Sequence, residues 1–318
     1  MAPWCPEDWL KHLAVVAPGL QPPDAAHEPA EATGTRARSA GWSLLLGSRR
    51  GRLHAHRGEH REDAGTVLTF AGGWCAAVAD GAGSATWSRL GSAIATHAVT
   101  HALREALSHG AAPVSALDGA LDQAATAADA AMRRFAVLCG LALRDLRTTL
   151  LVVVSHATQL ASMQVGDGAM AFLVGDGSAH ASTNTSPNAA MLLPHAGDSG
   201  EFSGEVTHFL PDEGAVERLR VSRKVHTPRD WSGILVASDG VEDPWYPFAR
   251  HAPALVAQLR DGVRDDNASA AGVTQHLRGA VLTANDPVHA LMEWLAFEKR
   301  GENDDRTLFV AWVPSPSA

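Results

Sequence analysis

The chain has 318 residues, 46% hydrophobic and 19% charged, which is ordinary for a folded protein with a sizeable core. Its formal net charge of -9 and isoelectric point near 5.9 argue against a general nucleic-acid or anionic-membrane binder, because such proteins carry a basic footprint. No apolar stretch approaches the roughly 18 residues of a spanning helix, and the N-terminus lacks a signal-peptide pattern. Three widely spaced cysteines form no disulfide framework or CxxC zinc motif, so we expect a cytoplasmic protein.

The N-terminal part has the composition of a leader. Residues 1–40 hold many prolines among Ala, Glu and Thr, with one short apolar patch from Trp9 to Val16. We therefore expect a partly disordered leader with one docking helix, followed by a single folded domain over 41–314.

Short strands and then two long helices are predicted after the leader. The strands are runs rich in aliphatic or β-branched residues, separated by Gly-rich breaks: Trp42 to Leu46, Thr66 to Phe70 and Cys75 to Ala79. The segments Ser84 to Ala111 and Val114 to Val137 are Ala-rich, with apolar residues at helical spacing.

The middle of the chain returns to strands. Thr149 to Ser155, Gln159 to Val165 and Ala169 to Val174 are interrupted by short turns, and this pattern predicts an antiparallel meander. Asn184 to Gly204 is rich in Asn, Pro, Gly and Ser and predicts a long surface loop.

Two further strands, three helices and a closing strand are predicted in the remaining chain. They are Val206 to Leu210, Gly233 to Ala237, Pro253 to Val263 with the proline at the first helical position, Ala268 to Leu282, Pro287 to Lys299, and Thr307 to Val313. Strands and helices occur in separate blocks without βαβ alternation, which indicates an α+β fold of two antiparallel sheets covered by helices.

Four acidic motifs lie at the ends of predicted strands. Each motif alone is more typical of a turn, because Asp-Gly is a favoured hairpin connection. They are Val78-Ala79-Asp80-Gly81, Val165-Gly166-Asp167-Gly168, Val236-Ala237-Ser238-Asp239-Gly240 and Asn303-Asp304-Asp305-Arg306.

Their repetition is the informative feature. Carboxylates at neighbouring sheet ends would repel one another, and hard divalent cations with oxygen ligands would neutralise them. Since no sulfur ligands accompany the motifs, Mg²⁺ or Mn²⁺ is favoured over zinc. Two such cations could activate water and clamp phosphate oxygens for hydrolysis of a phosphoester.

In order and context, these motifs resemble those of the protein phosphatase 2C (PPM) family, over about Trp42 to Val313. The resemblance also includes Gly58-Glu59-His60-Arg61-Glu62-Asp63-Ala64, the run from Val78 to Ser92, and Thr148-Thr149-Leu150. Within the family, the chain is similar to a bacterial subgroup. It implies a four-layer αββα sandwich and a cytoplasmic, metal-dependent phosphatase that acts on phosphoserine and phosphothreonine.

The resemblance also implies residue roles around two Mg²⁺ or Mn²⁺ ions, with a third, weaker ion. Asp80 would bridge the metal pair, the Gly81 carbonyl would ligate one ion, and Asp239 and Asp304 would complete the pair. Asp167 and Asp243 would hold the third ion. Glu62 would bind through water, and Asp63 would support the site.

On the substrate side the chain departs from the better-known members. The position of their phosphate-binding arginine is Gly58, so we favour His54 as the phosphate-side residue, with Arg57 as rival. Ala82 stands where eukaryotic members have a proposed general acid, which leaves protonation of the leaving group to metal-bound water, His54 or His56. The implied partner is a phosphorylated protein, the substrate of a serine/threonine kinase, rather than nucleic acid or membrane.

Simpler roles are expected for several other residues. Thr148 and Thr149 suit a strand start, and Glu302 and Asp305 suit added negative potential or a turn cap. Core burial is expected for four tryptophans, Trp87, Trp231, Trp245 and Trp294. Asp176-Gly177 is expected to form a plain hairpin turn.

Two alternative functions stay open on the sequence. One is a regulatory or binding module that keeps the fold with weak catalysis, suggested by Gly58 and Ala82. The other is hydrolysis of a small phosphoester by the same metals.

Overall fold

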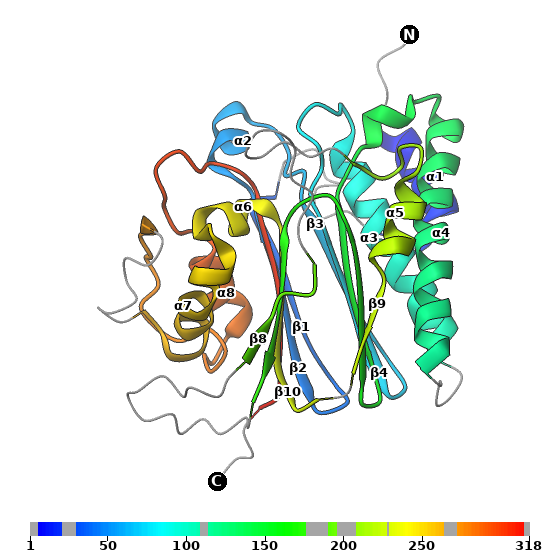
Figure 1. The fold of residues 1–318 in the computed structure, drawn as a ribbon. Coiled ribbons are helices and arrows are strands. Elements are labelled where there is room, and N and C mark those ends of the chain that lie inside the picture. Colours follow the sequence, from blue (N-terminus) through cyan, green and yellow to red (C-terminus); the bar gives the residue numbers. More distant parts are fainter. Residues whose placement is uncertain are drawn as a thin grey trace.

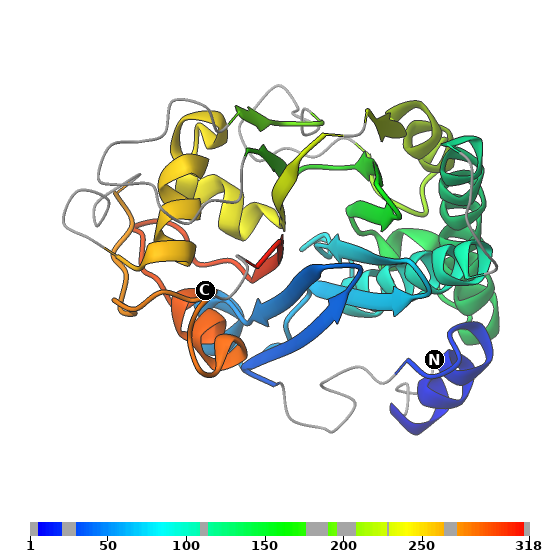
Figure 2. The same cartoon turned by 90° about the horizontal axis from the view of Figure 1, so that it is seen from below.

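Two antiparallel sheets lie face to face at the centre of the protein, and helices cover the outer face of each (Figure 1). This arrangement comes from a computed structural model that describes residues 6–20, 30–108, 114–175, 190–195, 208–227, 229–263 and 272–314. Figure 2 shows the two helical layers on opposite sides of the paired sheets. The four layers form an α+β sandwich, which confirms the fold class predicted from the sequence.

One sheet has six strands. They are β1 (Ala32–Ser39), β2 (Trp42–Arg49), β7 (Ala169–Val174), β8 (Ala190–Leu192), β10 (Trp231–Ala237) and β11 (Arg306–Trp312). Their order is β1-β2-β11-β10-β7-β8, and every neighbouring pair is antiparallel. The central pair sets Ala237 of β10 opposite Leu308 of β11, which places the start of the last strand beside the end of β10.

The other sheet has five strands. They are β3 (Ala64–Phe70), β4 (Gly73–Ala79), β5 (Leu150–His156), β6 (Gln159–Val165) and β9 (Lys224–His226), in the order β3-β4-β5-β6-β9. Every residue of β4 and β5 is buried, because the other sheet covers one face and helices cover the second. That double burial explains why both strands read as continuous apolar runs.

The helices divide between the two outer faces. The five-stranded sheet is covered by α1 (Pro6–Val16), α3 (Ser88–Leu107), α4 (Val114–Cys139) and α5 (Ala215–Ser222), and the six-stranded sheet by α7 (Phe248–Asp261) and α8 (Pro287–Trp294). Short helices at the sheet ends are α2 (Arg52–Arg57), α6 (Asp239–Glu242), η1 (Leu143–Leu146) and η2 (Asp243–Trp245). No helix in the described part of the chain has the length and apolar character that a membrane span requires.

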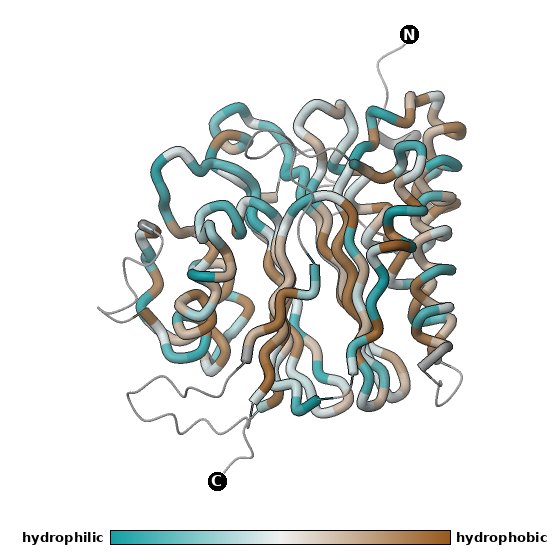
Figure 3. Tube along the Cα trace, viewed as in Figure 1, coloured by the Kyte–Doolittle hydropathy of each residue, from teal (hydrophilic) through white to brown (hydrophobic). Residues whose placement is uncertain are grey.

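Apolar side chains fill the space between each pair of layers, as the brown inner strands of Figure 3 show. Trp74 lies fully buried between the sheets, with its ring centroid 5.7 Å from that of Trp42 and 5.4 Å from that of Phe309. Trp245, which follows α6, stacks on Trp294 at the end of α8 with their ring centroids 6.2 Å apart, and both side chains are fully buried as expected. Trp87 and Trp231 are half-buried.

Several predicted elements differ from the observed ones. Strand β1 lies inside the predicted leader, so the sheet begins before residue 41. Helix α7 begins five residues before Pro253, which lies inside the helix rather than at its first position. The predicted helix from Ala268 to Leu282 is absent from its described part, 272–282, where turns and bends prevail.

Other differences concern loops. Of the predicted strand from Val206 to Leu210 only 208–210 are described, and there Leu210 makes an isolated bridge to Thr148. The expected Asp176-Gly177 turn lies outside the described residues. Of the loop expected from Asn184 to Gly204, only residues 190–195 are described. The polar stretch around His54, for which we predicted no element, forms helix α2.

The predicted meander is wrong at its last strand. β5 and β6 pair as a hairpin in one sheet, but β7 crosses to the other sheet and pairs with β10. The crossing turn contains Gly166 and Gly168, with φ of 85° and 87°, a region that favours glycine. A Cβ on Gly168 would lie 2.7 Å from the Ala237 carbonyl oxygen, so the turn sits directly against the end of β10. This crossing brings Asp167 to the end of the other sheet.

Candidate metal centre

The acidic motifs meet at one end of the sandwich. Asp80 follows β4, Asp167 lies in the turn between β6 and β7, and Asp239 begins α6 directly after β10. One carboxylate oxygen from each lies within 4.8 Å of the others. These residues are up to 159 positions apart in sequence, so the packing of the two sheets alone brings them together.

Main-chain and hydroxyl contacts hold Asp80 in place. The Asp80 amide donates to Thr149 Oγ1 over 2.9 Å, and Thr148 Oγ1 donates to the Asp80 carbonyl over 2.7 Å. The Thr149 amide donates to the same carbonyl over 2.8 Å. Thr148 and Thr149 are thus more than strand-forming residues, because both fix the backbone of the candidate bridging carboxylate.

Asp239 is positioned by a close approach of two chain segments. Its Oδ1 accepts a hydrogen bond of 2.6 Å from the Gly240 amide. A Cβ on Gly240 would lie 1.8 Å from the Asp305 carbonyl oxygen, so any side chain there would push α6 away from the loop before β11. Only glycine allows this contact, which keeps Asp239 beside the segment that carries Asp304.

Gly81 is similarly confined. It pairs with Thr148 in an isolated bridge, and a Cβ at this position would lie 2.7 Å from Ser88 Cβ and 3.0 Å from the Glu62 carbonyl oxygen. The turn after β4 therefore packs against the segment that holds Glu62 and Asp63.

Burial and mutual repulsion dominate the electrostatics of the centre. Burial is the largest cause that raises the pKa of Asp80 and of Asp239 well above the usual value. Neighbouring carboxylates add to the shift: Asp239 acts on Asp80, and Asp167 and Asp304 act on Asp239. Burial also raises the pKa of Asp304. Without a counter-charge, burial and repulsion therefore favour the uncharged form of these carboxyl groups more than in an isolated side chain.

The second layer of carboxylates behaves in the same way. Burial raises the pKa of Glu62 to about 7 and that of Asp63 to about 6. Asp63 is 3% exposed, and its Oδ2 accepts a hydrogen bond of 2.8 Å from Ser238, the residue before Asp239. Through this hydrogen bond Asp63 holds the end of β10 in place, next to the candidate ligands.

The donor set fits a hard divalent cation. It consists of half-buried carboxylate oxygens that lie close together. Mg²⁺ and Mn²⁺ prefer such oxygen ligands, and a bound cation would remove the repulsion that raises these pKa values.

Asp304 and Asp243 lie on the flanks of the three central carboxylates. Asp304 groups with His54 and Asp305, each offering a ligand atom within 4.8 Å of the others. Asp243 begins η2 one residue after Glu242, and burial followed by the charge of Glu302 raises its pKa. Asp167 and Asp243 both raise the pKa of Asp239, so the two residues implied for a third ion lie at this same end of the sandwich.

One further acid was not singled out from the sequence. Burial raises the pKa of Glu242 to about 7, and the charges of Asp243 and Asp167 add to the shift. The sequence shows Glu242 in the run Asp239-Gly240-Val241-Glu242-Asp243, but a glutamate at an exposed helix position would give the same local pattern.

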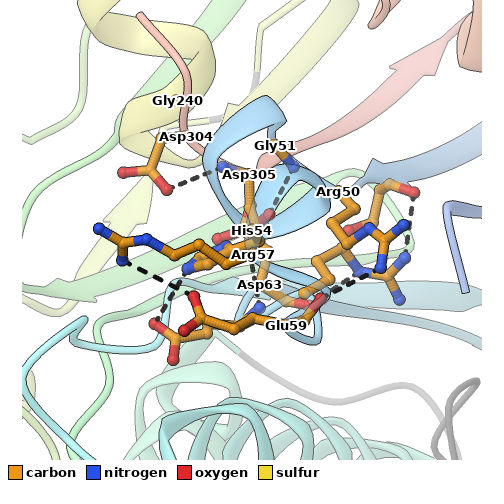
Figure 4. Close-up of polar contacts among 12 residues, drawn as sticks. Arg50, Gly51, His54, Arg57, Glu59, Asp63, Gly240, Asp304 and Asp305 are labelled. Atoms are coloured by element: carbon orange, nitrogen blue, oxygen red, sulfur yellow. Dashed lines mark hydrogen bonds and ion pairs between the residues drawn. The ribbon is translucent and has the colours of Figure 1, made fainter. Parts of the chain in front are cut away.

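The two candidates for the phosphate side differ in their surroundings. His54 projects from α2 into the acidic centre: its Nδ1 lies 3.0 Å from Asp305 Oδ2 and its Nε2 lies 3.9 Å from Glu62 Oε2 (Figure 4). Interaction with Asp305 is the largest cause that raises the His54 pKa to about 9, so the ring is a cation at neutral pH. Arg57 is exposed and pairs with Glu59 at 3.7 Å.

Asp305 has a more central position in the structure than we expected from the sequence. We expected an addition to negative potential or a turn cap, yet its side chain is 1% exposed and lies at the junction of three segments. Its Oδ1 accepts from the Gly51 amide and its Oδ2 from the Glu62 amide, both over 2.6 Å. Nothing in the local sequence indicates such burial, because Gly51 and Glu62 are distant in the chain.

Comparison with known structures places this fold among serine/threonine phosphatases. Serine-threonine phosphatase 2C from Toxoplasma gondii has a TM-score of 0.56 at 15% identity, covering 90% of this chain and 100% of its own. A bacterial serine phosphatase has a TM-score of 0.54 at 14% identity, covering 86% and 99%. The S. agalactiae serine/threonine phosphatase has a TM-score of 0.52 at 15% identity, covering 86% and 100%.

The family itself is shown by a sequence match. The family model described as Protein phosphatase 2C matches residues 50–295, most of the chain. The chain therefore belongs to the protein phosphatase 2C family, which confirms the family that its motifs resemble. No curated protein matches it.

Proposed function

We propose that this chain is a metal-dependent protein serine/threonine phosphatase that hydrolyses phosphoserine and phosphothreonine with water as the nucleophile. The observation that carries the proposal is the close approach of the Asp80, Asp167 and Asp239 carboxylates within 4.8 Å, with Asp304 close enough to raise the pKa of Asp239. A fold without a metal would have little physical reason to hold half-buried carboxylates so close together.

The residues that would hold the cations come from both sheets. Bound Mg²⁺ or Mn²⁺ would supply positive charge for the phosphate oxygens and lower the pKa of a water molecule. The assigned ligands and supports are Asp80, the Gly81 carbonyl, Asp239 and Asp304 for a pair of ions, Asp167 and Asp243 for a third ion, Glu62 through water, and Asp63 behind the site.

On the substrate side we assign His54 to the phosphate group. A histidine whose pKa is raised to about 9 carries a positive charge, and its ring faces the acidic centre where the phosphate would lie. Such a charge-assisted hydrogen bond would orient the phosphate and stabilise charge on its oxygens. Arg57, half-exposed and paired with Glu59, would act only on a substrate that reaches over the surface of α2.

The protein substrate follows from the family. Solved structures with this fold include a bacterial serine phosphatase and two serine/threonine phosphatases. We carry the substrate class to this chain as part of the proposal: a cytoplasmic protein phosphorylated by a serine/threonine kinase.

The test is release of phosphate from a defined phosphothreonine peptide. Wild-type protein is expected to show activity that depends on added Mn²⁺ or Mg²⁺, and Asp239→Asn is expected to lose it. Asp286→Asn is a matched control, since Asp286 caps α8 far from the centre by accepting from the His289 amide. Full wild-type activity in a chelator would overturn the proposal.

A catalytically weak module is the second candidate, favoured by Gly58 and Ala82 in place of the arginine and histidine of other members. It predicts Mn²⁺ binding by calorimetry with peptide hydrolysis at the background rate. The third candidate, a small-phosphoester hydrolase, predicts faster turnover of free phosphometabolites than of the phosphopeptide under the same conditions.

A further inference from the structure

Asp305 connects three segments that surround the candidate phosphate side. It precedes β11, next to Asp304, and its carboxylate receives the amides of Gly51, at the start of α2, and Glu62, in the acidic segment. The same carboxylate lies 3.0 Å from His54 Nδ1. Three groups from residues 51–62 thus converge on one buried side chain that lies at least 243 positions further along the chain.

The local backbone leaves little freedom at this junction. A Cβ on Gly51 would lie 2.4 Å from the Asn303 carbonyl oxygen, so α2 begins in direct contact with the loop that carries Asp304. The Leu53 amide donates to the same Asn303 oxygen over 3.2 Å. Helix α2 is therefore held by its N-terminal turn against this loop, and the position of His54 depends on that contact.

The chemistry of the junction calls for a carboxylate. All three partners can donate a proton, and an ionised carboxylate accepts on both oxygens. An asparagine would offer one acceptor and one NH₂, which would face at least one N–H donor at hydrogen-bond distance. Asparagine at this position would therefore leave either the main-chain contacts or the histidine contact unsatisfied.

We propose that Asp305 is a positioning residue that holds His54 by its Nδ1 atom and so turns Nε2 toward the metal centre. The inference rests on the proposed function, in which His54 binds the substrate phosphate. In this proposal the two carboxylate oxygens of Asp305 are occupied by the Gly51 and Glu62 amides and by His54, so Asp305 has no direct role toward metal or substrate. It acts by selecting one ring orientation of His54 and by tying α2 to the loop of Asp304 and to the Glu62 segment.

A double-mutant cycle on phosphopeptide hydrolysis tests this role. Asp305→Asn is expected to lower kcat/KM about tenfold or more in the wild-type background, and much less in the His54→Ala background, because the two residues act as one unit. A purely structural role of Asp305 predicts the same fold loss in both backgrounds and would overturn the proposal. Asp286→Asn, the remote control, is expected to leave kcat/KM unchanged in both.

A second readout is independent of turnover and of the Asp305 variant. In ¹⁵N-labelled wild-type protein, an imidazole Nδ1–H resonance protected from solvent exchange is expected, assigned to His54 by its loss in His54→Ala. Absence of a protected resonance would contradict the contact with Asp305 and sink the inference, whatever the activity of the protein.

The two proposals fail in different ways. If the wild type binds Mn²⁺ but releases no phosphate, the proposed function fails, and the cycle is repeated on the affinity for inorganic phosphate measured by calorimetry. Coupling between positions 54 and 305 in that affinity supports the positioning role, and independent effects of the two substitutions refute it.

Discussion

Ser238 Oγ donates a hydrogen bond of 2.8 Å to Asp63 Oδ2, although the two residues are 175 positions apart. The same hydroxyl accepts a hydrogen bond of 3.0 Å from the Thr307 amide. One buried hydroxyl thus joins the acidic segment before β3, the end of β10 and the start of β11. Ser238 directly precedes Asp239, so the hydrogen bonds that join these segments also fix the position of Asp239, a candidate metal ligand.

Replacement of this hydroxyl should destabilise the protein. Ser238→Ala leaves a buried amide and a buried carboxylate oxygen without their partner, and we expect a loss of about 1–3 kcal/mol in the free energy of unfolding. Urea denaturation in the presence of chelator measures it. Ser84→Ala, at an exposed position, should stay within about 0.5 kcal/mol of wild type. Equal stability of both variants would show that the Ser238 contacts contribute nothing.

The metal-free protein should lose stability as the pH rises from 6.5 to 9. Burial raises the pKa of Glu62 and of Glu242 to about 7, and the raised pKa values of Asp80 and Asp239 act in the same direction, so the folded state binds more protons than the unfolded chain and deprotonation disfavours folding. His54, with its pKa raised to about 9, acts in the same direction, because its favourable charge is lost as the pH passes that value. We expect a decrease on the order of 2 kcal/mol.

Four other histidines act in the opposite direction, but only near the lower end of this range. Burial lowers the pKa of His97, of His101 to about 4, of His195 to about 3 and of His226 to about 4, so they are neutral in the folded state while the unfolded chain still binds protons near pH 6.5. The comparison of pH 7.5 with pH 9 therefore carries the test. Urea denaturation in chelator at pH 6.5, 7.5 and 9 gives the profile, and saturating Mn²⁺ should flatten it. A stability that stays constant or rises with pH in chelator would contradict the electrostatic account of the centre.

His54 and Arg57 should differ in their effect on catalysis. His54→Ala is expected to reduce kcat/KM about tenfold to a hundredfold, as expected for loss of a charge-assisted contact to phosphate. Arg57→Ala should change it by less than about threefold, since its side chain is half-exposed and pairs with Glu59. Steady-state kinetics on one phosphothreonine peptide compare them. If only Arg57→Ala weakens substrate binding, the assignment of His54 is wrong.

The core between the sheets should be sensitive to truncation. Trp74→Ala removes a fully buried ring that touches Trp42 and Phe309, and we expect a loss of about 3–5 kcal/mol in the free energy of unfolding. Thermal or urea unfolding measures it. Val221→Ala, at a side chain that is 79% exposed, should remain within about 0.5 kcal/mol. A tolerated Trp74→Ala would mean that the sheets can close over the lost volume.

The candidate ligands were predictable because each carries a local signal. Asp80, Asp167 and Asp239 follow apolar strands and stand beside glycine, and this pattern can be read without knowing the fold. Their proximity in space was not predictable. The crossover from β6 to β7 brings Asp167 to the end of β10, where one of its carboxylate oxygens lies within 4.8 Å of those of Asp80 and Asp239. Whether a strand continues in one sheet or crosses to the other is decided by packing partners far along the chain.

The sequence by itself determined the strands and helices of the core, the two-sheet class and the acidic strand ends, because hydrophobic periodicity and turn chemistry are local properties. Only the tertiary structure shows that Ser238 donates a hydrogen bond to Asp63, that Asp305 is buried against His54, and that carboxylate oxygens of residues 80, 167 and 239 lie within 4.8 Å of one another. These relationships depend on the register and stacking of two sheets, and such long-range contacts are set by the whole core rather than by neighbours in sequence.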